Sequence, residues 1–443
     1  MVNRYNLYLY LLLGAFWVLS CTGFLGEELF PFLLEVRNGL FALCDVVFVI
    51  LGLLTLRDRG DKIVFWSFMT LGFVSTVIVN KIGLFNLFNG ARDFLGLIFA
   101  IPILRWFMTH ERREEFKQTM DKVLTWWLWL QAVTITIQFI EHGAGDWGGG
   151  TMGSGASGMV STSIYVISFF LIVRRWDSDH YFRSLWRNKM YVFLLYPTFL
   201  NETKVSFILL FAYFILLVKF DKQMIVKVLY IIPMAIVAFI GLGSIYLTVT
   251  EQDAEDLLSE EFYTNYFYGQ DLDFLIEVAM KVQDGTIEVD PRDWWAVDIP
   301  RFAKLVLINP EVRDCSGGVA LGAGLGQFKG WSMAEPPRFA RLNEWLLNGS
   351  RPWIFFMYVQ LGLLGYIWYI CVTVRNMRLR GSRYPSARKV FWLILLMIMI
   401  IQFYNDSLRF FNFDVLIMYM TLYMQLDVPD EDTNQKEAVV ATE

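Results

Sequence analysis

Residues 353–374 read WIFFMYVQLGLLGYIWYICVTV, a run of 22 residues without one charged side chain. The run lies between Arg351 and Arg375 and is rich in aromatic and branched aliphatic residues. A helix needs about 20 apolar residues to cross the hydrocarbon core of a bilayer, which is roughly 30 Å thick. This stretch therefore predicts a membrane-spanning helix.

Comparable apolar runs recur along the whole chain. They predict spans at 5–22, 39–56, 63–80, 86–104, 123–140, 158–173, 190–200, 205–218, 228–248, 353–374, 390–404 and 410–426. The expected fold is thus an all-α polytopic membrane protein with about twelve transmembrane helices. The first run has no convincing signal-peptide cleavage site after it, so we expect it to be retained as a helix.

The overall composition points to the same class. Of 443 residues, 56% are hydrophobic and 18% are charged, whereas a soluble domain carries about 25% charge. The net charge of -5 gives no support for a nucleic-acid partner. The four cysteines show no CxxC spacing and no histidine pattern, so we expect buried hydrophobes rather than a metal site or a disulfide framework.

The Lys and Arg residues predict the orientation of these spans. With the amino terminus inside, 24 of the 38 fall in inside segments, 5 in short outside loops and 9 in one long outside loop. This asymmetry follows the positive-inside rule and places both termini in the cytoplasm. Both flanks of residues 190–218 are then inside, which predicts a short hairpin whose outer tip is Asn201 to Lys204.

Four regions follow from this topology. Spans one to nine occupy residues 1–248, an extracytoplasmic and mostly helical loop domain occupies 249–352, and spans ten to twelve occupy 353–426. Residues 427–443 are expected to form a disordered acidic cytoplasmic tail. Within the loop domain, 249–290 is acidic, while 291–352 has eight basic and six acidic residues. We expect the second part to lie on the membrane and bind an anionic group.

Two glycine-rich loops are predicted on the outer side. One is the run 321–328, with Gly322, Gly324 and Gly326. It has neither the GK[ST] of a phosphate-binding P-loop nor a surrounding strand–helix unit. It is either a tight turn packed against a helix or a backbone that approaches a phosphate or a sugar. The other loop, 141–158, contains Asp146 and Trp147 and is either a flexible rim or a contact for a glycan.

Five outer cations lie at or near membrane depth, where charge is costly and indicates function by default. Each alone could be a snorkelling anchor or part of an ion pair. Together they could converge on a lipid diphosphate, whose phosphates need several cations. They are Arg92, Lys204, Arg301, Arg351 and Arg409.

In its layout of spans, loops and outer cations, the chain resembles the O-antigen polymerase and O-antigen ligase superfamily. The members of this superfamily are polytopic, GT-C-like glycosyltransferases. The resemblance covers nearly the whole layout, with about twelve spans and a large outer loop between the ninth and the tenth. Its motifs are Lys204 at the polar break before span eight, Arg301 followed by the 322–328 glycine run, and the Leu361 to Gly365 segment, while Arg92 resembles a basic residue of the early outer loop. Ligases usually carry a His-Asn pair before span ten, and this chain has Leu347 to Arg351 without histidine there.

The resemblance implies a bacterial inner-membrane polymerase that joins undecaprenyl-diphosphate-linked repeat units at the periplasmic face. It implies inverting transfer with no metal and no cofactor, and pathway partners such as a chain-length regulator and a flippase. Cations would stabilise the diphosphate leaving group, and a carboxylate would take the acceptor proton. The catalytic candidates are Arg301, Lys204, Glu202, Asp298 and Glu344.

Two alternatives stay open. One is a ligase that transfers a lipid-linked glycan to another acceptor. The other, of a different class, is a transporter or flippase for lipid-linked oligosaccharide. Twelve spans fit a transporter, but such proteins often show two related halves, and no internal repeat is visible here.

Overall fold

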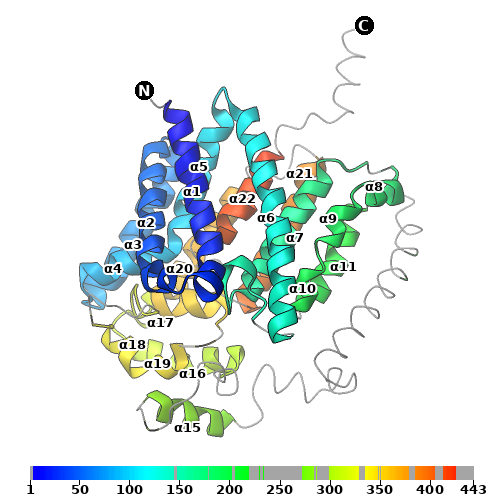
Figure 1. Cartoon of the computed structure of the whole chain (residues 1–443). Helices are drawn as coiled ribbons and strands as arrows, with labels where there is room; N and C mark the ends of the chain where they lie inside the picture. Colours follow the sequence, from blue (N-terminus) through cyan, green and yellow to red (C-terminus); the bar gives the residue numbers. More distant parts are fainter. Residues whose placement is uncertain are drawn as a thin grey trace.

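A computed structural model shows an all-helical protein (Figure 1). It describes residues 3–143, 147–177, 179–201, 205–218, 272–283, 299–328, 335–347, 351–378, 385–404 and 413–425, and the single residues 229, 233, 286 and 349. Within these ranges there is no β-strand. The predicted fold class is therefore confirmed at the level of an all-α membrane protein.

Six helices in the described part of the chain are long and apolar enough to cross a membrane. Several are built from consecutive helical segments, because α1 (Arg4–Phe24) continues into the π-helical η1 (Leu25–Leu29), and α3 (Arg59–Phe73) into η2 (Val74–Val79). The full set is Arg4–Glu27, Phe32–Thr55 (α2), Arg59–Val79, Leu84–Thr109, Arg113–His142 (α6) and Trp353–Met377 (in α20, Trp353–Arg378). Each coincides with one of the predicted spans.

The fourth of these helices is compound, and shorter helices complete the bundle. The fourth joins α4 (Leu84–Ala91), η3 (Arg92–Phe94) and α5 (Leu95–Thr109). The shorter helices are α7 (Ser157–Val173), α8 (Tyr181–Arg187), α9 (Lys189–Phe193), α10 (Pro197–Leu200), α11 (Val205–Leu217), α21 (Pro385–Tyr404) and α22 (Phe413–Met424). The predicted span 228–248 and the predicted tail 427–443 lie outside the described residues, apart from residues 229 and 233.

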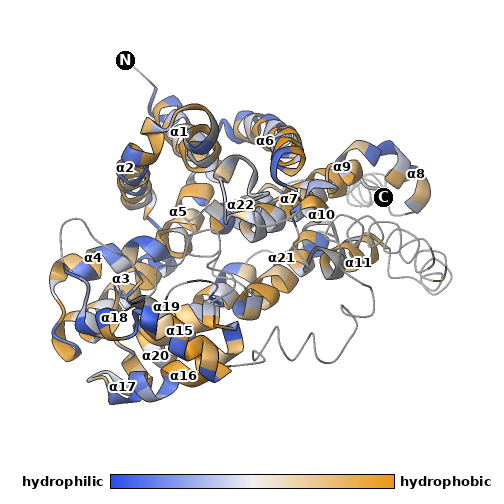
Figure 2. Cartoon of the chain, turned by 60° about the horizontal axis from the view of Figure 1, so that its bottom comes forward, coloured by the Kyte–Doolittle hydropathy of each residue, from blue (hydrophilic) through white to orange (hydrophobic). Residues whose placement is uncertain are grey.

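The outward faces of the long helices are apolar, as a membrane requires. On α2, Leu43, Val46 and Ile50 are each about half exposed, and in Figure 2 apolar residues appear on helices throughout the bundle. A soluble monomer rarely exposes contiguous apolar surface of this extent. The exposed side chains therefore identify the surface that faces lipid.

Two parts of the 191–217 stretch that are distant in sequence contact the same residue of α7. Ser168 of α7 donates to the carbonyl oxygen of Tyr191 at 2.8 Å and lies 2.8 Å from the hydroxyl of Tyr213. Between these two points the chain reaches Asn201, which is buried and lies 2.9 Å from the hydroxyl of Ser161. As far as Asn201 this path agrees with the predicted hairpin; residues 202–204 of its predicted tip lie outside the described residues.

Hydrogen bonds join several helix ends at one end of the bundle. We call this end the terminal end because α1 begins there. Tyr5 donates to the carbonyl oxygen of Arg112, just before α6, at 3.0 Å. Lys389 of α21 donates to the carbonyl oxygen of Leu217, the last residue of α11, at 2.9 Å. The sequence places Arg112 and Lys389 on the inside, and Tyr5 and Leu217 at the inner ends of predicted spans; the side of the membrane stays a prediction.

The opposite end, here called the loop end, carries the described helices of the loop domain (Figure 1). These are α15 (Leu272–Gln283), α16 (Arg301–Asp314), α17 (Gly318–Leu321), α18 (Arg338–Leu342) and α19 (Glu344–Leu347). Most of them share a second hydrophobic cluster with the first turns of α20, in which Ile308, Leu346, Phe355 and Val359 are fully buried. The loop domain is thus anchored on α20, next to the main core of the bundle.

Candidate functional site

Arg301 begins α16 at the loop end. Pro300 precedes it with extended ψ, and the fixed φ of proline favours the start of a helix at this point. The guanidinium carbon of Arg301 lies 5.0 Å from the ring centroid of Tyr404, the last described residue of α21. The rings of Phe302 and Phe403 stack beside this contact at 6.2 Å. Arg301 is therefore held over an aromatic face and remains half-buried.

Lys304 lies one turn after Arg301 on α16 and is fully buried. Residues three apart share a face of a helix, so the two cations lie on the same side of α16. Sequence reasoning missed Lys304, which lies between the apolar pair Phe302–Ala303 and the apolar residues 305–308. The Arg-x-x-Lys spacing is the signal that could have identified it.

Arg351 lies just before α20 and is the second of the predicted outer cations at the loop end. Its Nη1 donates to the carbonyl oxygen of Leu347 at 2.5 Å, and its guanidinium carbon lies 5.3 Å from the ring centroid of Phe328. Phe328 in turn packs on Phe356 at 4.8 Å. Arg301 and Lys304 thus belong to α16 and Arg351 to the residues before α20, and these two helices pack together in the second hydrophobic cluster.

Arg92 lies where α4 passes into α5 and forms an ion pair. Its Nε is 2.5 Å from Oδ2 of Asp45 on α2, and the side chains are 25% and 11% exposed. This is the arrangement of a buried intramembrane pair. Asp45 is the partner that the sequence did not assign to it.

The other predicted polar residues have different positions. Glu344 begins α19 and is exposed. Trp147 is 38% exposed, with its ring 6.1 Å from that of His142. Four of the remaining candidates and the predicted glycan contact Asp146 lie outside the described residues; the four are Glu202, Lys204, Asp298 and Arg409.

The 321–328 segment, here called the glycine-rich segment, packs between η2, α4 and α20. The N–H of Ala323 donates to the carbonyl oxygen of Val359 at 2.7 Å, and that of Leu325 to Oγ1 of Thr76 at 2.9 Å. Gly322, Gly324 and Gly326 all have positive φ, from 65° to 90°, which favours glycine. The structure gives these glycines a packing role, which is the first of the two interpretations above; a contact with a glycan stays a prediction.

The second glycine-rich loop is partly buried. Thr151 receives a hydrogen bond from Gln131 at its side-chain oxygen, and its N–H donates to Oε1 of Gln131 at 2.9 Å. Gln138 makes two hydrogen bonds with the backbone of Gly150. Two glutamines of α6 therefore bind this turn at Gly150 and Thr151, while the choice between a flexible rim and a contact for a glycan stays a prediction.

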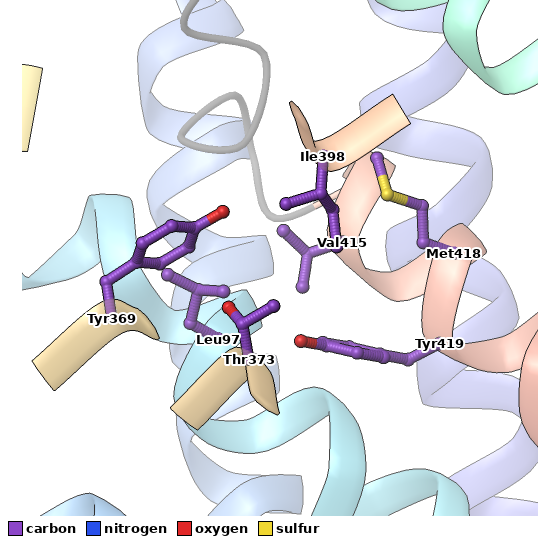
Figure 3. Close-up of a pocket in the computed structure, with 7 residues that line it drawn as sticks. All are labelled: Leu97, Tyr369, Thr373, Ile398, Val415, Met418 and Tyr419. Carbon is purple, nitrogen blue, oxygen red and sulfur yellow. The ribbon is translucent and has the colours of Figure 1, made fainter. Parts of the chain in front are cut away.

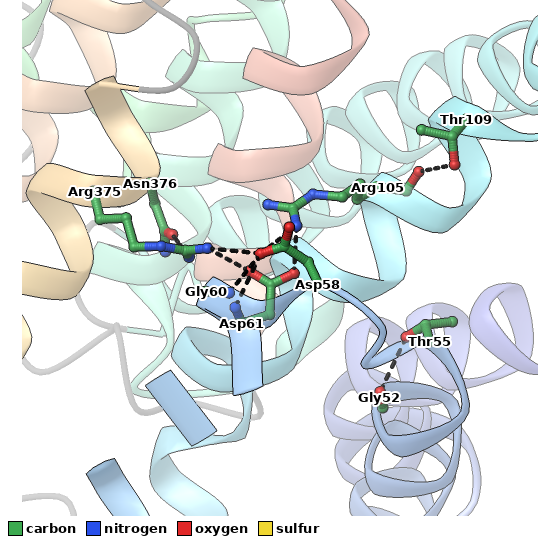
Figure 4. Close-up of polar contacts among 9 residues, drawn as sticks. All are labelled: Gly52, Thr55, Asp58, Gly60, Asp61, Arg105, Thr109, Arg375 and Asn376. Carbon is green, nitrogen blue, oxygen red and sulfur yellow. Dashed lines mark hydrogen bonds and ion pairs between the residues drawn. The ribbon is translucent and has the colours of Figure 1, made fainter. Parts of the chain in front are cut away.

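An ion cluster at the terminal end joins three helices (Figure 4). Asp61 of α3, which is 2% exposed, lies 2.7 Å from Nη1 of Arg105 and 2.9 Å from Nη2 of Arg375. Asp58 caps α3 through the N–H of Gly60 at 2.8 Å. Partial burial would raise the pKa of Asp58, but the charge and hydrogen bond of Arg105 outweigh it, and the pKa lies below its usual value.

A small apolar cavity lies deeper in the bundle (Figure 3). Its walls come from α5, α20, α21 and α22, and the hydroxyl groups of Tyr369, Thr373 and Tyr419 point toward one another across it. Gln402 donates to the hydroxyl of Tyr369 at 2.9 Å. The cavity is too small for a substrate, so it contributes packing rather than a binding site.

Among the described residues, no group of three or more His, Cys, Asp or Glu side chains could hold a metal ion. Comparisons with known proteins identify no relative: no family model, no curated protein and no solved structure matches the chain. The candidate site therefore has to be judged from its own chemistry.

Proposed function

We propose that the chain is a glycosyltransferase that joins undecaprenyl-diphosphate-linked repeat units into a polysaccharide at the outer face of the bacterial inner membrane. The observation that carries this proposal is that Arg301 and Lys304 lie on α16 and Arg351 just before α20, two helices that share the hydrophobic cluster of the loop end. Cations beside an apolar surface suit a ligand with a charged head and a hydrocarbon tail.

The chemistry asks for positive charge where the leaving group develops negative charge. An acceptor hydroxyl attacks the anomeric carbon, the bond from that carbon to the diphosphate oxygen breaks, and the configuration inverts. Arginine and lysine groups fixed beside the diphosphate would stabilise the charge that it gains in the transition state. Arg301, Lys304 and Arg351 would provide this positive charge. Lys204 and Arg409 would add to it from the outer turns in which the sequence places them.

The acceptor hydroxyl must also lose a proton during the attack. A carboxylate within hydrogen-bond reach would act as the base. Glu202 and Asp298 are two candidates, and they lie two and three residues before the proposed cations Lys204 and Arg301. Glu344 is the third candidate and is accessible to a soluble part of the acceptor.

The acceptor itself is proposed to be a second lipid-linked repeat unit, which makes the enzyme a polymerase. The segment before α20 supports this choice over a ligase, because Leu347 to Arg351 contains no histidine. A flippase that delivers the repeat units and a chain-length regulator are the partners that such a reaction needs.

A pair of substitutions on α16 tests the proposal. Arg301→Ala should lower turnover about 10²–10³-fold, the usual effect of removing one group that stabilises transition-state charge. Arg313→Ala is the matched control, because Arg313 is an exposed arginine in the last turn of the same helix. Lys204→Ala should behave like Arg301→Ala. Product formation is measured on purified protein; full activity of both Arg301→Ala and Lys204→Ala would contradict the diphosphate site.

A further inference from the structure

Four buried amide side chains gather around Gly326 of the glycine-rich segment. Asn86 and Asn89 belong to α4, Gln327 follows Gly326, and Gln360 belongs to α20. Their exposed fractions are 9%, 2%, 3% and 0%. We call these four side chains the amide cluster.

Several short contacts bring the cluster together. The N–H of Gly326 donates to Oε1 of Gln360 at 2.8 Å. A Cβ added to Gly326 would lie 3.2 Å from Cβ of Asn86, and one added to Gly90 would lie 2.3 Å from the nitrogen of Gly326. The face of α4 that carries Asn86 and Gly90 therefore meets the glycine-rich segment. Asn89, three residues after Asn86, shares that face.

Five polar atoms of the cluster make no hydrogen bond with any residue that the structure describes. They are Oδ1 of Asn86, Oδ1 and Nδ2 of Asn89, Oε1 of Gln327 and Nε2 of Gln360. Buried side-chain polar atoms are in large majority hydrogen-bonded, because burying one without a partner is costly. Asn80, only six residues before Asn86, shows the ordinary case, since its amide bonds Ser75, Gly322 and Gly317.

The unpaired donors and acceptors indicate which chemical groups of a ligand could form hydrogen bonds with them. Two of the side chains offer unpaired NH₂ donors and three offer unpaired carbonyl acceptors, with no charge among them. Hydroxyl groups both donate and accept, so they match this mixture. Phosphate oxygens at neutral pH accept hydrogen bonds, and three unpaired acceptors would oppose them. The cluster thus fits an uncharged, hydroxyl-bearing group.

We propose that the amide cluster binds hydroxyl groups of the sugar that is joined directly to the lipid diphosphate. This inference rests on the proposed function, in which Arg351, whose guanidinium lies over the ring of Phe328 next to Gln327, belongs to the cations near the diphosphate. Because all four side chains are at least nine-tenths buried, the sugar reaches them when α4 and the glycine-rich segment move apart.

The test compares two lipids on Asn89→Leu, a substitution of similar size that removes both unpaired atoms. The probes are undecaprenyl diphosphate and undecaprenyl diphosphate carrying N-acetylglucosamine, with binding measured on the full chain in nanodiscs. Wild type should bind the glycosylated lipid more tightly. Asn89→Leu should lose roughly tenfold of that preference, the effect of one or two hydrogen bonds, and should bind the bare lipid as wild type does.

Thermal unfolding separates this role from a structural one. Asn89→Leu should unfold at the wild-type temperature or above it, because it removes unpaired buried groups. Asn80→Leu, which removes three hydrogen bonds, should unfold at a lower temperature. An unchanged lipid preference, or a destabilised Asn89→Leu, overturns the sugar site alone. If wild type binds neither lipid, the diphosphate proposal fails and the sugar site fails with it.

Discussion

Asp61 is a buried carboxylate that joins three helices at the terminal end. It is 2% exposed, and its two carboxylate oxygens bind Arg105 of α5 and Arg375 of α20. A carboxylate between two arginines neutralises charge that would otherwise be left at the edge of the bundle. Asp61 therefore fixes three helices relative to one another, far from the cations of the loop end.

Replacement of Asp61 should consequently be severe. Asp61→Asn removes the buried carboxylate that Arg105 and Arg375 share, while both arginines keep the partly exposed Asp58 at 3.1 and 3.4 Å. The cost should therefore be a part of the about 3–5 kcal/mol that a buried charge left without a partner costs. We expect Asp61→Asn to lower the unfolding temperature in detergent strongly. Asp58→Asn is the internal control, since that side chain is 47% exposed and exposed pairs contribute about 0–1 kcal/mol. Equal unfolding temperatures for the two variants would refute the assignment.

Individual residues were only partly predictable. Arg301 and Arg351 could be identified because charge near an apolar run is conspicuous, and both lie at the loop end. Lys304 was missed, although it is fully buried. The pairing of Arg92 with Asp45 joins residues 47 positions apart in the chain, and such long-range partners cannot be read from local sequence.

At the scale of elements, the kink of α20 organises the loop end. Gly362 has φ 62° and ψ -158° inside this helix. A Cβ at this position would lie 2.6 Å from both the carbonyl carbon and the oxygen of Ala320. The missing side chain lets α17 lie directly on α20. The sequence singled out Gly362 by resemblance, but the reason is this close approach.

Gly362→Ala should therefore destabilise the protein. A non-glycine residue at positive φ costs of order 1–3 kcal/mol, and the overlap with Ala320 adds to that. Gly39→Ala in α2 is the matched control, because no atom lies within 4 Å of its added Cβ and alanine favours a helix. Unfolding temperatures should fall for Gly362→Ala and stay or rise for Gly39→Ala; the same change in both would contradict the packing described.

Helix positions were the most predictable part of the fold. The run 353–374 corresponds to α20, Trp353–Arg378, because apolar length is a strong local signal. Helix ends were less predictable: α2 begins at Phe32 rather than near 39, and α6 at Arg113 rather than near 123. Polar turns continue these helices beyond their apolar stretches, and hydropathy does not detect them.

At the scale of the whole molecule, the proposed reaction requires two ends of the bundle that face opposite sides of the membrane. Helices α15 to α19 lie at the loop end (Figure 1). The ion cluster of Asp61 joins the first turn of α3 to the last part of α5, close in sequence to Arg112, which Tyr5 of α1 contacts. The sequence assigns these ends to the outside and the inside from the distribution of Lys and Arg. That assignment, and the count of twelve spans, are proposals that need a direct test.

Cysteine labelling provides that test. In a chain with its four native cysteines replaced, Glu344→Cys should react with an impermeant maleimide on intact spheroplasts. Glu111→Cys, exposed between α5 and α6, should react only after the membrane is permeabilised. The opposite pattern would invert the topology, and labelling of both positions from one side would contradict the alternation of spans.

As a polymerase, this chain is proposed to join lipid-linked repeat units without any other acceptor. Purified wild-type protein is incubated with undecaprenyl-diphosphate-linked repeat units extracted from the organism that produces it, and the products are separated by length. We predict chains of several repeats, together with release of undecaprenyl diphosphate. Absence of elongation, or product that forms only after another acceptor is added, would contradict the claim.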